Sequence, residues 1–180
     1  VMIPRGGLAQ IAHIQGSHIG IEPGTRMSML SSPSVFGGMR TIWGALPSGA
    51  TICPFSVETQ GLERMAEWLR SERIAILHCT PSVLRHFGKS LPADARFNSL
   101  RIVIFGADRV LAEDIALARG LFQQDVRVWT GLGASETGTE SAATRSESGP
   151  LSHPATEGIR KSAIASAIIP NARKLDQRSI

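Results

Sequence analysis

The chain has few aromatic residues, few cysteines and no long apolar run. Phe and Trp together make up 5% of its 180 residues, and Tyr is absent. No apolar stretch approaches the roughly 20 residues that a transmembrane helix needs. The N-terminus also lacks the basic-then-apolar order of a signal peptide. We therefore expect a cytoplasmic protein with no membrane span.

The two cysteines, Cys53 and Cys79, stand far apart and lack the spacing of metal ligands. Two buried free thiols in a reducing compartment are the expected state.

The net charge of +4 is concentrated near the C-terminus. Residues 1–150 hold 14 Lys and Arg against 13 Asp and Glu, whereas residues 151–180 hold 5 against 2. No basic stripe interleaved with aromatic residues accompanies the charge. A nucleic-acid surface is therefore not expected.

Apolar strands alternate with single helices along most of the sequence. The apolar spacing predicts a helix from about Leu8 that closes at Gly16, and further helices over 38–46, 62–69, 80–88 and 111–122. It predicts strands over 26–30, 50–53, 73–77, 100–105 and 126–129. Buried strands alternating with helices are typical of parallel sheets covered on both faces. The predicted fold class is α/β, with doubly wound, Rossmann-like βα units.

This alternation ends near Pro150. We expect one domain over residues 1–150, followed by an irregular and poorly ordered tail over 151–180.

The segment 131–139, Gly-Leu-Gly-Ala-Ser-Glu-Thr-Gly-Thr, follows the last predicted strand. Small residues followed by a hydroxyl and a carboxylate suit a turn that meets a polyphosphate and its metal ion. The same composition also suits a plain turn, in which Glu136 is a solvated carboxylate. Two other loops, 78–82 and 106–108, leave the carboxyl ends of predicted strands, where ligands bind in open parallel sheets. The three loops together predict one site.

Residues from about Met2 to Thr144 resemble the middle of the large domain of adenylate-forming (AMP-binding) enzymes. These are the acyl-CoA synthetases and the adenylation domains of nonribosomal peptide synthetases. Segments 42–51, 76–85, 100–108 and 131–139 carry the resemblance, in the family's order. Such enzymes attack the α-phosphate of ATP with a carboxylate and then pass the acyl group to a thiol. The resemblance implies ATP, Mg²⁺, a carboxylic-acid substrate, and either CoA or the phosphopantetheine arm of a carrier-protein domain.

On the nucleotide side, the resemblance assigns Ser135 to phosphate and Glu136 to Mg²⁺. Gly133 and Leu132 belong to the same segment, and Leu132 replaces the Tyr that usually packs on adenine. That replacement keeps an apolar face and loses ring stacking. Gly106-Ala107-Asp108 resembles the Gly-Gly-Glu segment that borders adenine and the acyl pocket, with Ala for Gly as a mild change.

The acyl pocket implied by the resemblance contains Phe36, Gly37, Arg40, His78, Ile104, Gly131 and Thr139. Amino-acid-activating members carry an Asp at the position of Phe36, where it pairs with the substrate ammonium. An aromatic ring cannot neutralise a buried ammonium as a carboxylate does, although a cation–π contact is open to it. We therefore expect an acid without an α-amino group, such as a fatty, aryl or hydroxy acid.

Two of these residues have a plainer interpretation. Arg40 could meet a second substrate carboxylate or be a solvated arginine on a helix, and the second interpretation is preferred. His78 could contact substrate or serve as a hydrogen-bonded residue at a strand end. The remaining histidines form no ligand-like spacing.

The family's Lys-containing phosphate loop, its ribose-binding Asp and its small C-terminal domain have no counterpart in the sequence. We therefore expect a fragment of an adenylate-forming ligase, of the peptide-synthetase type, that is inactive alone. The alternatives are a noncatalytic nucleotide-binding or interaction domain and a degenerate gene product, which fold alone does not separate. An exposed sheet edge also predicts self-association.

Overall fold

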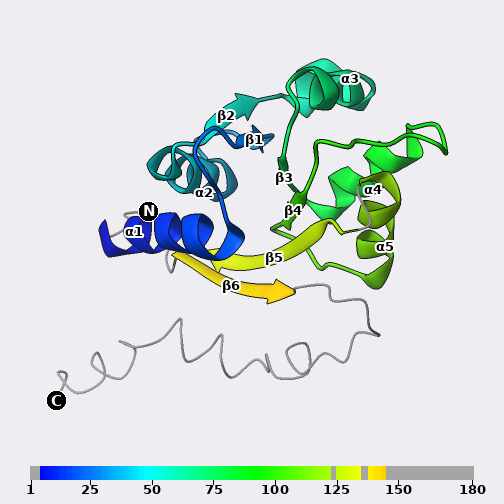
Figure 1. The fold of residues 1–180 in the computed structure, drawn as a ribbon. Helices are drawn as coiled ribbons and strands as arrows, with labels where there is room; N and C mark the ends of the chain where they lie inside the picture. The colour runs from blue at the N-terminus through cyan, green and yellow to red at the C-terminus, as the bar shows by residue number, and fades with distance from the viewer. Residues whose placement is uncertain (1–4, 123–124, 135–137, 145–180) are drawn as a thin grey trace, which may run out of the picture. The chain divides into compact units, whose positions relative to one another are not determined.

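The computed structural model describes residues 5–122, 125–134 and 138–144. They contain one six-stranded sheet with the strand order β2-β1-β3-β4-β5-β6 (Figure 1). The strands are β1 Arg26–Met29, β2 Thr51–Pro54, β3 Ile76–Cys79, β4 Ile102–Phe105, β5 Arg127–Ala134 and β6 Gly138–Thr144. The first five are parallel to their neighbours, and β6 is antiparallel to β5.

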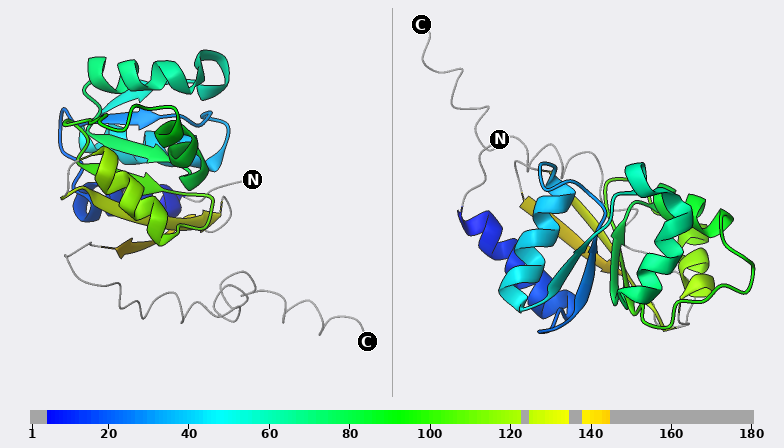
Figure 2. Two further views of the ribbon diagram at one scale, coloured as in Figure 1. Left: turned by 90° about the vertical axis from the view of Figure 1, so that its right-hand side faces the viewer. Right: turned by 90° about the horizontal axis from the view of Figure 1, so that it is seen from above.

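Helices cover both faces of this sheet. They are α1 Arg5–His13, α2 Phe36–Ala45, α3 Val57–Ser71, α4 Pro81–Lys89 and α5 Ala112–Leu121. Figure 2 shows α1 and α2 on one face and α3, α4 and α5 on the other. This arrangement confirms the predicted α/β class with parallel βα units.

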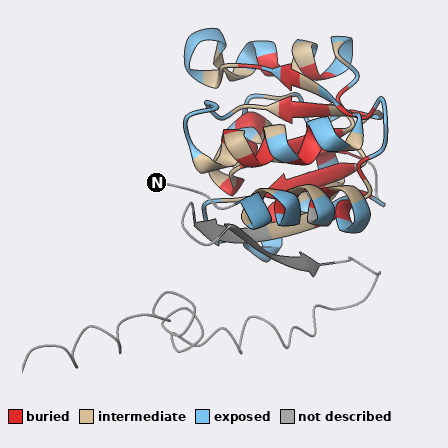
Figure 3. Ribbon diagram, turned by 90° about the vertical axis from the view of Figure 1, so that its left-hand side faces the viewer, coloured by how far each residue is buried: buried red, intermediate tan, exposed pale blue. Residues whose placement is uncertain are grey.

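The central strands are buried on both sides, as Figure 3 shows for the sheet. All four residues of β4 are buried. Ile102 and Ile104 join an apolar cluster with Met27 and Ala45, on the α2 side. Val103 and Phe105 join the larger cluster beneath α3, α4 and α5. Because side chains alternate along a strand, this one apolar run supplies both cores.

The predicted loop over residues 131–139 is wrong for 131–134 and 138–139, which lie in strands. β5 continues through Ala134, and its backbone pairs with β6 from Val128 opposite Thr144 to Ala134 opposite Gly138. Because small and hydroxyl residues show no apolar alternation, the sequence pattern does not predict the pairing of β5 with β6. Residues 135–137 lie outside the described part of the chain.

The N-terminal helix also differs from its prediction. Gly16 does not end it, because α1 continues into a π-helical segment, η1 Ile14–Ile19. Gly20 then ends it in the left-handed conformation, with φ 77°. A glycine adopts that conformation without the steric cost of a side chain, which suits the end of a helix.

Helix α2 begins two residues before its predicted start and buries the opposite face. Trp43 and Leu46, which belong to the apolar spacing that predicts this helix, are 43% and 58% exposed, whereas Arg40 is 4% exposed. Glycines explain the reversal. A Cβ on Gly38 would lie 2.1 Å from the Ser32 carbonyl oxygen, so this turn of the helix lies directly on backbone. The preferred interpretation of Arg40 as a solvated residue is therefore wrong.

Gln15 of η1 fills the groove beside a second glycine of α2. A Cβ on Gly44 would come within 2.2 Å of the Gln15 side chain. The Gln15 Nε2 group donates a 2.9 Å hydrogen bond to the Arg40 carbonyl oxygen. Helix α2 is thus held against both the preceding loop and the N-terminal segment.

The helices on the other face are joined by an ion pair. Arg85 of α4 donates to both carboxylate oxygens of Asp114 in α5, at 2.6 and 2.8 Å. Asp114 is buried and also accepts from the Leu111 backbone N–H at 2.7 Å, which caps α5. The pKa of Asp114 is lowered by the Arg85 hydrogen bond, so it is ionised at neutral pH.

The expected state of the two cysteines is confirmed. Cys53 and Cys79 are buried free thiols. Within the described residues, no helix is both long and apolar enough to span a membrane.

Candidate functional site

A cavity of about 300 Å³ lies at the carboxyl ends of β3 and β4, beside the start of α2. Its lining comes from the β1–α2 loop, α2 and the two strand ends: Ser31, Val35, Phe36, Gly37, Arg40, His78, Cys79, Thr80, Gly106 and Ala107. The two strands pair in parallel, and the Gly106 N–H donates to the Cys79 carbonyl oxygen at 3.3 Å. Two of the three predicted loops, 78–82 and 106–108, therefore meet at one site.

Local sequence explains how the cavity wall after β3 is formed. Thr80 has extended backbone, and its hydroxyl accepts from the Val83 N–H at 3.2 Å. Pro81 follows at the first helical position, where no N–H is needed. Helix α4 therefore begins directly after β3, as predicted.

Arg40 supplies the positive charge of the cavity. It is buried, and its Nε atom has no hydrogen-bond partner. Burial lowers the pKa of Arg40 to about 10. None of the lining residues is acidic. The cavity thus contains a desolvated guanidinium without a counter-charge in its lining.

His78 stands opposite this charge as a neutral ring. Burial, and then the positive charge of Arg40, lower the pKa of His78 to about 3. Its Nδ1 atom lies 2.9 Å from the Thr41 hydroxyl, which lies 3.0 Å from the Gly37 carbonyl oxygen. Since that carbonyl can only accept, we assign the Thr41 proton to it and the ring proton to Nδ1. His78 then has both predicted features, a structural hydrogen bond and a place in the cavity wall.

The loop after β4 carries a strained residue. Ala107 has φ 67°, in the left-handed region where glycine is favoured. Alanine at this position is therefore a less mild change than the sequence suggests. Asp108 beside it is exposed, and its carboxylate accepts from the Arg109 N–H at 2.7 Å.

Six predicted site residues line the cavity together: Phe36, Gly37, Arg40, His78, Gly106 and Ala107. Ile104 pairs in register with His78 but lies in the buried cluster, outside this lining. Asp108 follows the lining directly.

Four more of the predicted site residues lie in strands β5 and β6. Gly131, Leu132 and Gly133 lie in β5, and Thr139 lies in β6 opposite Gly133. Ser135 and Glu136 lie outside the described residues.

Sequence reasoning missed four lining residues: Ser31, Val35, Cys79 and Thr80. Cys79 and Thr80 stood within a predicted loop, which was the available signal. Ser31 and Val35 belong to a loop whose sequence has no motif or apolar periodicity, so their place at the cavity could not be predicted from the sequence.

The side chains that could bind a metal ion do not form a metal centre within the described residues. No group of three or more His, Cys, Asp or Glu side chains comes together in the ranges that the structure describes. The predicted Mg²⁺ ligand, Glu136, is not among those residues.

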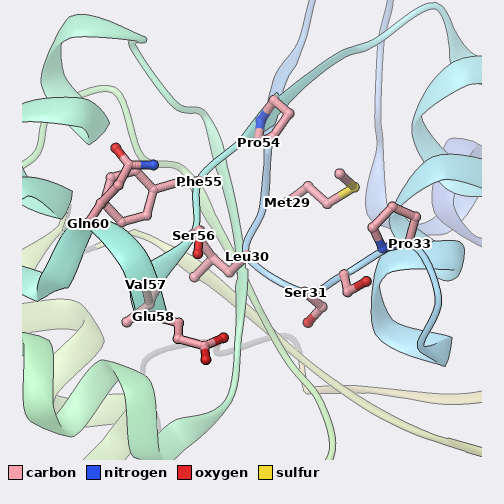
Figure 4. A pocket seen from close by; sticks show the side chains of 11 residues that line it. Met29, Leu30, Ser31, Pro33, Pro54, Phe55, Ser56, Val57, Glu58 and Gln60 are labelled. Carbon is pink, nitrogen blue, oxygen red and sulfur yellow. The ribbon is translucent and has the colours of Figure 1, made fainter.

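A second hollow of about 760 Å³ lies where β1 and β2 end and α3 begins (Figure 4). Its polar side chains include Ser31, Ser56, Glu58 and Gln60, and Glu58 and Gln60 are exposed. It contains no buried charge comparable to Arg40. The smaller cavity is therefore the stronger candidate site.

Comparisons with known proteins show the family to which the chain is similar. A family model described as AMP-binding enzyme matches residues 1–170. The nonribosomal peptide synthetase phqB of Penicillium fellutanum is 27% identical over 142 residues, which are 79% of this chain and 5% of that protein. The hybrid PKS-NRPS synthetase TAS1 of Pyricularia oryzae is 32% identical over 110 residues, or 60% of this chain and 6% of that one. The chain thus spans a small part of the length of these relatives.

Solved structures show the same fold. The crystal structure of the nonribosomal peptide synthetase FmoA3 superposes with a TM-score of 0.70 at 20% identity, covering 81% of this chain and 16% of that one.

Proposed function

The chain belongs to the AMP-binding enzyme family, and we propose on this premise that it is part of the large domain of an ATP-dependent adenylate-forming ligase. The ligase activates a carboxylic acid as an acyl-adenylate and passes it to the thiol of CoA or of a carrier-protein phosphopantetheine arm. The observation that carries the proposal is the cavity at the ends of β3 and β4, which gathers six residues predicted for substrate and nucleotide.

The cavity wall suits an acid without an α-amino group. Phe36 lines it and, by the resemblance, takes the place of an ammonium-binding carboxylate; the lining that the structure describes contains no Asp or Glu. A substrate ammonium would share a small, partly desolvated space with the Arg40 guanidinium. Like charges at such distances repel strongly because little water screens them. We therefore propose a fatty, aryl or hydroxy acid rather than an amino acid.

The nucleotide belongs at the neighbouring edge of the same site. Gly106-Ala107-Asp108 leads away from the cavity, and the β5–β6 hairpin carries Leu132 and Gly133 on the strand next to β4. We propose that Ser135 contacts phosphate and that Glu136 holds Mg²⁺, whose charge would neutralise the phosphates. The fixed strand ends would orient the acid carboxylate for attack, and such positioning supplies much of the rate in reactions of this kind.

Binding of a stable acyl-adenylate analogue tests the proposal on the chain itself. An aryl-sulfamoyl adenosine should bind with one site per chain in a calorimetric titration. Gly106→Val should weaken binding of the analogue. A Cβ at this position would lie 3.4 Å from His78 Nε2, and the two methyl groups of valine would enlarge that contact. Gly120→Val is the matched control, since nothing lies within 4 Å of a Cβ there. Failure of the analogue to bind would contradict the proposal.

A second measurement separates the ligase from a noncatalytic nucleotide-binding domain. Acid-dependent exchange of pyrophosphate into ATP should be absent in this chain and present in a longer polypeptide that supplies a phosphate loop and a catalytic lysine. Analogue binding without exchange in either polypeptide would favour the noncatalytic alternative.

A further inference from the structure

The Arg40 guanidinium is the one feature of the cavity that the proposed reaction leaves unexplained. A buried charge is normally paired, because removal from water is costly unless a partner and hydrogen bonds replace the lost hydration. Arg40 is 4% exposed, and among the residues that the structure describes its Nε–H has no partner and no acidic side chain lines the cavity. The unpaired Arg40 guanidinium can therefore donate to an acceptor that comes from outside the described residues.

The helix directs this donor toward the substrate space. Phe36 and Arg40 are four residues apart in α2, so they share a face of the helix, and both line the cavity. Gly37 between them contributes no side chain. The Arg40 carbonyl is fixed by Gln15 at 2.9 Å, and Gly38 seats the preceding turn on the Ser32 backbone. The arginine therefore extends from a firmly held helix.

The chemistry of the surroundings favours an anion. Guanidinium presents a planar fork of N–H donors that matches the two oxygens of a carboxylate, and the pairing is stronger where water is excluded. His78 is neutral, so it adds no competing positive charge, and in the assigned tautomer its Nε2 atom is an acceptor. Arg40 is therefore the charged donor of this lining.

We infer that Arg40 is a specificity-determining residue that binds a second carboxylate of the substrate, so that the preferred acid is a small dicarboxylic acid. The inference rests on the proposed function, because it takes the cavity to be the acid pocket. A volume of about 300 Å³ stands at the lower end of typical ligand pockets, which fits a short or single-ring diacid.

Matched acids test the inference on the intact chain. Hexanoate and adipate, and benzoate and isophthalate, are pairs in which the second member adds one carboxylate to the same framework. Ligand-detected NMR titrations should show that the diacid of at least one pair binds at least tenfold more tightly than its monoacid. Equal binding within both pairs, weaker binding of the diacids, or no binding of any of the four would overturn the inference.

Variants locate the preference at Arg40. Arg40→Met should reduce diacid affinity to about that of the monoacid, and Arg40→Lys should restore part of the preference because it keeps the charge and loses the fork. Arg64→Met is the matched control, since it removes the same group from an exposed position on α3. An unchanged diacid preference in Arg40→Met, or an equal loss in the control, would refute the assignment.

A phosphate of the nucleotide is the competing anion, and a pyrophosphate titration separates the two. If Arg40→Met weakens pyrophosphate as strongly as it weakens the diacid, Arg40 serves the nucleotide and the inference fails. Failure of the proposed function looks different, because the acyl-adenylate analogue would then not bind at all. A monoacyl analogue that binds as tightly as the diacid-derived one would leave the function intact and contradict only the role of Arg40.

Discussion

Replacing Arg40 with methionine should stabilise the fold of the unliganded chain. Burial lowers the pKa of the guanidinium from its ordinary value to about 10, which corresponds to a penalty of about 3 kcal/mol for keeping the charge in the folded state. Methionine retains an unbranched apolar stem of similar length and removes the charge. Allowing for water that reaches the cavity, we expect Arg40→Met to raise the free energy of unfolding by about 2 kcal/mol.

Urea denaturation followed by circular dichroism measures this difference, with Arg64→Met as the control of unchanged stability. The folded-state pKa lies below that of the unfolded chain, so the penalty is fully present below about pH 10 and shrinks as pH rises toward the ordinary pKa of arginine. The advantage of the variant should therefore be constant from pH 6 to 9. A variant less stable than the parent by 1 kcal/mol or more would refute the reasoning, because Arg40 would then be a structural residue with a favourable partner.

Three further outcomes are expected. Asp114→Ala should lower the free energy of unfolding by about 2 kcal/mol at pH 7, because it removes the acceptor for the Leu111 N–H and for Arg85. The pKa of Asp114 is lowered in the folded state, so this difference in stability should shrink as pH falls through that pKa. A difference that stays constant down to pH 2 would contradict this explanation. Ala107→Gly should raise stability by up to about 1 kcal/mol by relieving the left-handed strain, which a lower thermal midpoint would contradict. Replacing both Trp43 and Leu46 with Gln should reduce self-association measured by sedimentation, since both are exposed apolar side chains. An unchanged association constant would show that the contact between copies lies elsewhere.

Sequence pattern predicted the elements whose burial is decided locally. The run 100–105 is apolar at most positions and became β4, buried on both faces, and Thr80-Pro81 contains its own helix-start signal. The predicted helix over 62–69 matches the part of α3 that follows Gly61, whose non-helical φ of 77° interrupts the range Val57–Ser71. The first turn was missed because the apolar stripe begins at Leu62, whereas the Ser56 hydroxyl caps that turn by accepting from the Thr59 N–H.

Two features depend on tertiary contacts and could not be predicted in this way. The inward face of α2 is set by how closely Gly38 and Gly44 approach other segments, which overrides the apolar spacing of the helix. The burial of Arg40 follows from that packing. Strand β6 exists because β5 offers it a hydrogen-bonding edge, and its composition of Gly, Thr, Ser, Ala and Glu carries no strand periodicity.

The contact between Gln15 and Gly44 has an evolutionary consequence. A side chain of any size at 44 would overlap the glutamine, whose amide also steadies the backbone of Arg40. Relatives that enlarge the residue at 44 should therefore carry a shorter one at 15, and the two sites should change together although 28 other positions separate them in the chain. Divergence of acid preference within such a lineage would then involve a position on the N-terminal segment that contacts the backbone of Arg40 and does not line the cavity.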